Sequence, residues 1–340
     1  MKMKVYMTLC GLTALIVSTA LHGSETSPSS VLVSETQRHM GVKWSITAYS
    51  ADSHTAREAI LDAHNEITRL EQILSDYDPE SELVRISSQA PNATPIQISQ
   101  ELWEVLNCAI TWRGVTKGAF DPTIGPLTKL WRQSRQSGVM PRPDKLKAAK
   151  ALVGPELLHL HPTMNSISLR RRGMRLDLGG IGKGFAADSA IDVLRQHHIT
   201  SGMVDASGDI VVLGSPPGRD SWQIAVQPLG KSEGKLSKVG LSDAAIATSG
   251  DAFQSVTINN IRYSHIVDPR TGLGVKGPTA VTVIAENCTT ADVLATAASV
   301  LGLEEGMSLI RSRRHAAARF VWEDDTGSRH SVSSSNWPDQ

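Results

Sequence analysis

Cysteine is scarce in this 340-residue chain, which contains only Cys10, Cys108 and Cys288. Three cysteines this far apart supply neither a disulfide framework nor the spacing of zinc ligands. Cys10 lies inside an apolar run and follows the bulky Leu9, so it does not fit the lipid-modified cysteine of a lipoprotein. Packing is the predicted role of Cys108 and Cys288, with a disulfide between them in an oxidising compartment as the alternative.

An excess of either charge is also missing, because Lys plus Arg and Asp plus Glu number 34 each. A balanced chain has no net field to recruit nucleic acid or an anionic membrane surface. We find no internal repeat of fixed short period. An apolar fraction of 40% at this length allows a large core in one large domain or two smaller ones, and excludes a disordered or fibrous protein.

The N-terminal apolar run, Val5–Val17, is short for a bilayer span. It follows Lys2 and Lys4 and precedes Ser18-Thr19-Ala20, which fits a small-x-small cleavage site. Residues 1–20 are therefore predicted to be a Sec-type signal peptide, which indicates an exported, periplasmic protein. If the segment is not cleaved, it would instead attach the protein to the inner membrane.

The rest of the chain divides into a Ser/Thr-rich flexible lead-in at 21–36, a domain at 37–325 and a polar C-terminal tail at 326–340. Helical periodicity and caps predict long helices at Ala56–Leu74, after Ser99, from Phe185 to His197, and at Ala291–Leu301 with Thr289-Thr290 as cap and Gly302 as end. Short strand patterns are predicted at 40–48, 157–160, 167–170, 174–176, 202–214, 222–226, 245–248, 255–258, 262–267, 280–285 and 318–322. Residues 134–150 are polar and basic, with a short helical pattern near 145–152, and are predicted to lie on the surface. Long helices mixed with consecutive strands favour an α+β fold.

The stretch Asp177–Asp188 joins a carboxylate, a glycine-rich turn, a lysine and a predicted helix start. Backbone N–H groups in such a turn, together with Lys183, suit an anionic ligand such as a phosphate. The alternative is a tight turn with a solvated lysine. Of two known phosphate loops, the P-loop fits poorly, and a Rossmann dinucleotide-binding turn remains as an alternative. A P-loop would need glycine at the position of Asp177 and a hydroxyl residue at the position of Gly184. A Rossmann turn needs G-x-G-x-x-G, whereas this chain has G-x-G-x-G. Asp205, after the next strand, does resemble the acid that binds the ribose in that fold.

Two polar groupings elsewhere suggest chemistry. Asp292 and Thr296 are four residues apart on the last predicted helix, so both present hard oxygen ligands on one face and could bind a metal ion. The alternative is that Asp292 is an acid of the first helical turn and Thr296 a packed core residue. In Ser264–Gly272, His265 lies on a predicted strand and Asp268 begins a turn. Either can act as a general base or simply brace that turn.

Seven motifs in this order resemble the ApbE family of FAD:protein FMN transferases, from Met40 to about Trp322. They are Met40-Gly41, Leu74-Ser75-Asp76-Tyr77, Gly118-Ala119-Phe120-Asp121-Pro122-Thr123, Asp177-Leu178-Gly179-Gly180-Ile181-Gly182-Lys183-Gly184, Ala247-Thr248-Ser249-Gly250, His265–Gly272, and Ala291-Asp292 with Ala295-Thr296. The resemblance implies an α+β fold related to the T-fold, with mixed sheets packed with long helices and a small helical and irregular subregion. The ordered set is far more specific than any one motif.

The resemblance also implies roles for individual residues. It implies that Met40, Tyr77, Ala119, Phe120, Asp121, Asp177, Lys183 and Val267 line the FAD site, and that the Gly180 carbonyl, Asp292 and Thr296 hold Mg²⁺. Two positions depart from the family pattern: Ala295 stands where some members carry an Asp, which leaves one or two metal ions open, and Asp205-Ala206-Ser207-Gly208-Asp209 replaces Asn-x-Gly-Gly-Asp.

The implied activity is Mg²⁺-dependent transfer of FMN from FAD to a Thr or Ser hydroxyl, with release of AMP. Its acceptors would be exported domains of membrane redox complexes that carry an Asp/Ser-Gly-Ala/Ser-Thr motif, and His265, or Asp268, would remove the hydroxyl proton. The alternatives are an Mg²⁺-dependent FAD hydrolase that gives FMN and AMP, and a non-enzymatic periplasmic FAD-binding protein.

Overall fold

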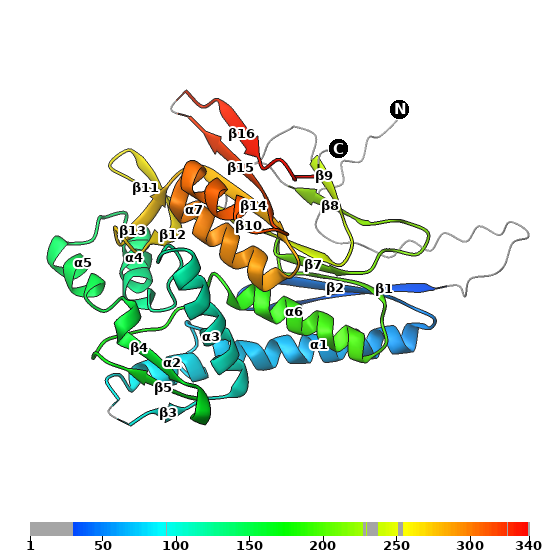
Figure 1. Cartoon of the computed structure of the whole chain (residues 1–340), viewed down its shortest axis with the longest axis horizontal. Helices are drawn as coiled ribbons and strands as arrows, with labels where there is room; N and C mark the ends of the chain where they lie inside the picture. The colour runs from blue at the N-terminus through cyan, green and yellow to red at the C-terminus, as the bar shows by residue number, and fades with distance from the viewer. Residues whose placement is uncertain are drawn as a thin grey trace, which may run out of the picture.

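The structure is a computed structural model that describes residues 30–92, 94–226, 229, 237–250, 254–324 and 326–338. Its centre is an eight-stranded sheet with the strand order β1-β2-β6-β7-β10-β14-β15-β16 (Figure 1). These strands are β1 (Val31–His39), β2 (Val42–Ser50), β6 (Ser201–Asp205), β7 (Ile210–Leu213), β10 (Ala244–Gly250), β14 (Thr279–Ala285), β15 (Ala317–Glu323) and β16 (Arg329–Ser333).

Three long helices, α1 (Ser53–Leu74), α6 (Gly182–Gln196) and α7 (Cys288–Arg311), pack side by side on one face of this sheet (Figure 1). Asp52 caps α1 by accepting the N–H groups of His54 and Thr55, each at 2.9 Å. The buried contacts of α6 and α7 are rich in alanine, which lets the helices approach closely. By length and composition α7 could cross a membrane, but most of it is buried inside the fold.

The opposite face of the sheet is covered in part by the hairpin of β8 (Trp222–Val226) and β9 (Ser237–Leu241). Side chains from this hairpin form a separate apolar cluster with β7 and β10. The middle of the sheet is therefore buried on both sides.

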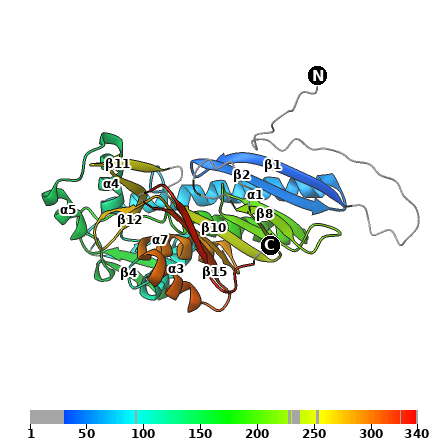
Figure 2. The ribbon, with the colours of Figure 1, turned by 90° about the horizontal axis from the view of Figure 1, so that it is seen from above.

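A second group of elements packs at one end of the sheet (Figures 1 and 2). It comprises α2 (Glu82–Ser88), α3 (Gln100–Val115), α4 (Gly125–Ser137), α5 (Pro143–Lys150), β3 (Ile96–Gln97), β4 (Leu158–His161), β5 (Ser166–Leu169), β11 (Ser255–Ile258), β12 (Ile261–Asp268) and β13 (Leu273–Lys276). Trp131 of α4 is buried against Tyr263 of β12, and its Nε1–H donates to the Ser264 carbonyl at 2.8 Å. This contact fixes α4 beside the strand that carries His265.

The predicted α+β class is confirmed, and so are most of the predicted elements. All strand pairs among the described residues are antiparallel. The sheets are thus antiparallel where mixed sheets were expected. The Rossmann alternative is wrong as well, because it requires a parallel sheet.

Several predicted boundaries are wrong for identifiable reasons. Met40 was expected on the first strand but lies with Gly41 in the β1–β2 hairpin turn, where both have positive φ, 48° and 76°. Residues 174–176 form no strand, although Met174 and Leu176 are buried. The helix expected from Phe185 begins at Gly182, so the later glycines belong to its first turn.

The last long helix also differs from its prediction. Its cap is Asn287, whose side chain accepts the N–H of Thr290 at 2.8 Å. Gly302 has φ 79° and ψ −176°, which is not a helical conformation, so the first helical stretch of α7 ends there as predicted and a second stretch continues to Arg311.

Both ends of the predicted domain extend further than the composition indicates. Residues 31–36, expected in the flexible lead-in, form part of β1 and pair with β2. Residues 329–333, expected in the polar tail, form β16 at the opposite edge of the sheet. Edge strands expose their side chains to water, so their polar composition imitates a loop. The predicted signal peptide, 1–20, lies outside the described residues.

The predicted surface excursion at 134–150 is largely helical. Its first residues are the end of α4, which has Pro126 in its first turn and Gly138 at φ 69° as its C-cap, and α5 follows. The sequence prediction missed the main part of α4 because its turn-like start, with two prolines and a glycine, was assigned to an irregular corner.

A buried histidine pair joins β1 to α1 near the hairpin turn. His39 Nε2 lies 3.0 Å from His64 Nδ1, and the two side chains are 5% and 1% exposed. Burial, with a smaller contribution from the charge of His39, lowers the pKa of His64 from 6.5 to about 4. Burial raises the pKa of Asp76, at the end of α1, to about 6.

We expect His64 to make the fold less stable as the pH falls from 6.5 to 4, because the unfolded chain binds a proton there that the folded chain does not. The free energy of unfolding falls by ~3 kcal/mol over this pH range because of His64. Asp76 acts in the opposite direction, since its folded form holds a proton up to higher pH. Comparison with His64→Asn isolates the contribution of the histidine. In urea unfolding, the free energy of unfolding of the wild type relative to His64→Asn should fall by ~2–3 kcal/mol between pH 7 and pH 4.5. An unchanged difference would contradict this assignment.

Candidate functional site

The segment 177–184 forms the centre of the candidate site and is held by several other elements. The Asp177 N–H donates to the Pro122 carbonyl at 2.9 Å, and its carboxylate accepts the Gly179 N–H at 2.9 Å and the Thr128 hydroxyl at 2.6 Å. Asp177 is 8% exposed. Its carboxylate is therefore fixed in direction before any ligand arrives.

Arg132 of α4 connects this segment to the loop that follows α1. Its guanidinium lies 2.6 Å from Asp76 and 3.4 Å from Asp177, so one cation bridges two buried carboxylates. The same guanidinium stacks on the Tyr77 ring, 4.1 Å from its centroid. Tyr77 is 75% exposed. An arginine thus supports one face of an exposed aromatic ring, which leaves the ring available to a planar ligand.

The N-termini of α6 and α7 meet at the other end of the segment. The Gly184 N–H donates to Asp292 Oδ2 at 3.2 Å. A Cβ at Gly184 would overlap the Cys288 carbonyl and lie 2.8 Å from Thr289 Cα, so the two helices can approach this closely only with glycine at 184. Asp188 strengthens the junction by accepting both the Cys288 and Thr289 N–H groups at 2.8 Å.

Gly180 lies against Thr296, which is one helical turn after Asp292 on α7. A Cβ at Gly180 would lie 3.0 Å from Thr296 Oγ1 and 3.2 Å from the Phe120 ring, so the Gly180 backbone lies directly against the threonine. Ser249 of β10 is 3.1 Å from the same hydroxyl. Burial raises the pKa of Asp292, and the charge of Lys183 and the Gly184 N–H act against that rise.

This donor set fits a magnesium ion. The described residues contain no group of three or more His, Cys, Asp and Glu that could hold a metal. A cation here would therefore depend on the buried Asp292 together with hydroxyl and carbonyl oxygens, which are hard ligands of the kind that Mg²⁺ accepts. Ala295 is fully buried and adds no carboxylate.

Lys183 is not the solvated lysine of the alternative interpretation. Its ammonium forms an ion pair with Asp209, which is 4% exposed and lies just before β7. The turn 205–209 thus supplies the acid that binds Lys183. The lysine charge therefore remains inside the site, close enough to affect Asp292.

His265 and Asp268 lie at the edge of the site on β12. The β12–β13 register shifts between Tyr263 and Val267, so strict alternation of faces does not extend through His265. His265 is half-buried, and its backbone N–H donates to the Gln254 backbone carbonyl at 3.0 Å. Asp268 accepts Arg270 through both carboxylate oxygens, at 3.0 and 3.1 Å. Asp268 thus braces the turn, which favours His265 as the base.

The remaining predicted residues contribute mainly to the walls. Ala119 and Phe120 are buried, and Val267 is buried in the cluster between α4 and β12. Asp121 accepts Arg113 at 2.6 Å and the Thr123 N–H at 2.9 Å, so it makes a rigid corner. Met40 packs partly buried against the main core.

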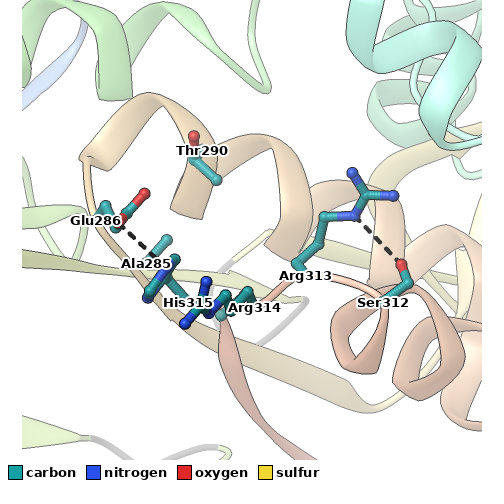
Figure 3. Close-up of a pocket in the computed structure, with 8 residues that line it drawn as sticks. Ala285, Glu286, Thr290, Ser312, Arg313, Arg314 and His315 are labelled. Carbon is teal, nitrogen blue, oxygen red and sulfur yellow. Dashed lines mark hydrogen bonds and ion pairs between the residues drawn. The ribbon is translucent and has the colours of Figure 1, made fainter.

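Two other features, the cysteines and a surface hollow, add no ligand to the site. Cys108 and Cys288 are both free, which agrees with a packing role. A hollow of about 210 Å³ lies between the start of α7 and the segment after it (Figure 3). It is lined by Glu286, Thr290 and residues 312–316, and none of the predicted site residues borders it.

Arg132, Thr128 and Ser249 are contact residues of the site to which the sequence prediction assigned no role. Thr128 and Arg132 are four residues apart on one face of α4, with Trp131 packing beside them. The signal that could have found them was helical: Pro126 at a first turn, followed by Leu127, Leu130 and Trp131 at helical spacing.

Comparison with known proteins shows the family of this chain. The chain matches the ApbE family over residues 40–320. It is 31% identical over 290 residues to the FAD:protein FMN transferase of Treponema pallidum, covering 81% of this chain and 79% of that protein, and 33% identical over 265 residues to the protein of that name from Vibrio cholerae, covering 77% and 78%.

Solved structures agree. The flavin transferase ApbE from Vibrio cholerae superposes with a TM-score of 0.80 at 30% identity, over 90% of this chain and 98% of that one. The ApbE protein of Thermotoga maritima gives 0.78 at 27% identity, over 88% and 96%. The named relatives and the matching fold define this chain as a transferase. It belongs to the ApbE family, which confirms the resemblance seen in its motifs.

Proposed function

We propose that this protein is an FAD:protein FMN transferase that moves FMN from FAD to a Thr or Ser hydroxyl of an acceptor protein and releases AMP. One observation carries the proposal: segment 177–184 joins an arginine-supported, exposed Tyr77 at one end to the buried oxygens of Asp292 and Thr296 at the other. That arrangement suits a ligand with an aromatic ring and a diphosphate. The names of the relatives supply the same pair of substrates.

Asp292, Thr296 and the Gly180 carbonyl would hold Mg²⁺. When bound, Mg²⁺ neutralises charge on diphosphate oxygens as a P–O bond breaks. The protein's own residues orient the bound nucleotide. Asp177 and Arg132 fix Tyr77, and the ion pair with Asp209 keeps the Lys183 charge beside the nucleotide.

The chemical step needs an acceptor oxygen and a place for its proton. The acceptor hydroxyl loses its proton to the His265 imidazole, and its oxygen forms a bond to the phosphorus on the FMN side. The bond from that phosphorus to the bridging oxygen breaks, and AMP leaves with this oxygen. FMN stays on the acceptor through a phosphoester. Holding the reactants in line supplies much of the acceleration.

The acceptor would be an exported protein domain that carries an Asp/Ser-Gly-Ala/Ser-Thr motif, as in membrane redox complexes. This proposal rests on the family resemblance and on the N-terminal segment, which indicates a site of action outside the cytoplasm.

Intact-mass measurement of an acceptor with this motif tests the proposal. Incubation with the protein, FAD and Mg²⁺ should add the mass of FMN less one water to the acceptor and release one AMP, and EDTA should prevent both. AMP release without modification of the acceptor would indicate FAD hydrolysis instead. Bound FAD without AMP under any metal condition would indicate a carrier protein.

A further inference from the structure

Two arginines on α4, Arg132 and Arg135, lie one turn apart but differ in their charge partners. Arg132 is compensated by Asp76 and Asp177. Arg135 forms no ion pair with any residue that the structure describes. Its Nη2 donates to the neutral Gln254 side chain at 3.3 Å, and its buried Nε has no hydrogen-bond partner within the described ranges.

Arg135 lies near Tyr77 and near the segment that pairs with the His265 backbone. Residues three apart on a helix are neighbours, so Arg135 lies next to Arg132, the arginine that stacks on Tyr77. Its other neighbour, Gln254, accepts the backbone N–H of His265 through its carbonyl. Burial lowers the pKa of Arg135, and both Tyr77 and Arg132 are near enough to influence that pKa. The guanidinium therefore lies near the exposed ring and near the segment that pairs with the candidate base.

A half-buried guanidinium that has no counter-ion among the described residues is unfavourable as it stands and becomes favourable when an anion binds. Its planar fork of N–H donors matches phosphate oxygens. If Tyr77 carries a ring of the nucleotide and His265 receives the acceptor's proton, the reacting diphosphate passes between them. We propose that Arg135 binds a phosphate of FAD. The inference rests on the proposed function and deepens it by assigning a further substrate-binding residue.

Arg135→Gln tests this inference, with Lys145→Gln as the matched control. Lys145 lies on the neighbouring α5 and is exposed, so its variant removes the same charge away from the site. Fluorescence titration should show that Arg135→Gln binds FAD roughly 10-fold more weakly, a usual effect of one charge-assisted hydrogen bond. Riboflavin, which lacks phosphate, should bind the variant as it binds the wild type. The control should bind both ligands normally.

Salt and a second variant sharpen the test. FAD affinity of the wild type should fall with ionic strength more steeply than that of Arg135→Gln. Arg135→Lys keeps the charge without the fork and should recover part of the affinity. An equal loss for riboflavin and FAD, or no loss for either, would overturn the inference. So would a normal FAD affinity with a raised KM for the acceptor, because Arg135 would then bind the acceptor protein. A wild-type protein that binds no FAD would overturn the proposed function as well as this inference. An active wild type beside an Arg135→Gln variant with unchanged FAD affinity would overturn this inference alone.

Discussion

Replacement of Asp292 by asparagine is expected to lower the rate of FMN transfer by a factor of ~10³, the loss that follows when several kcal/mol of charge stabilisation disappear. Asp292 is 3% exposed and is the acidic member of the oxygen set around Gly180 and Thr296. Asparagine keeps its shape and still accepts the Gly184 N–H, but it contributes no negative charge to hold a cation. Initial rates from acceptor mass, measured over a range of Mg²⁺ concentrations, provide the readout.

The fold should survive this change. Burial raises the pKa of Asp292, which means that the protein carries its charge at a cost in stability. Asp292→Asn is therefore expected to melt at or above the wild-type temperature while losing activity. Asp192→Asn on the exposed face of α6 is the control and should transfer FMN normally. EDTA should inhibit the wild type and add little to the loss in Asp292→Asn. A variant that retains normal transfer with normal Mg²⁺ dependence would disprove the metal-binding role.

Sequence reasoning reached the parts of the site that local spacing determines. Asp292 and Thr296 follow from the four-residue period of a helix, and the glycine-rich turn follows from its composition. Their meeting was implied only by the family resemblance, because the contact between Gly184 and Cys288 depends on how α6 and α7 pack across about a hundred residues of chain.

Other parts of the site depend on contacts that no local pattern encodes. The bridge from Arg132 to Asp76 and Asp177 joins three segments, and the role of Arg132 emerges only when α4 is folded against them. The alternative of a solvated Lys183 stayed open in the sequence because its partner Asp209 lies beyond the next strand. The edge strands β1 and β16 were missed in part because exposed strands and loops share a polar composition.

The β12 strand illustrates how geometry separates two candidates that are equivalent in sequence. His265 and Asp268 are close in the chain and both can accept a proton. Asp268 is bound through two oxygens to Arg270, which also donates to the Val300 carbonyl of α7 at 3.0 Å. An acid engaged in this way stabilises the junction between the turn and the helix. Loss of Asp268 should therefore affect stability first and proton transfer little.

The second large effect is expected from His265→Ala, which should reduce the transfer rate by ~10²–10⁴-fold, the usual contribution of a general base. FAD affinity should change little, because the imidazole acts on the acceptor hydroxyl. The expected signature is a lower kcat at saturating FAD and acceptor, with an unchanged Kd for FAD from fluorescence titration. His159→Ala, an exposed histidine on β4, is the matched control. Near-normal kcat in a folded His265→Ala that binds FAD would exclude this histidine as the base and would leave positioning at Asp292, Lys183 and Arg135 to account for the catalysis.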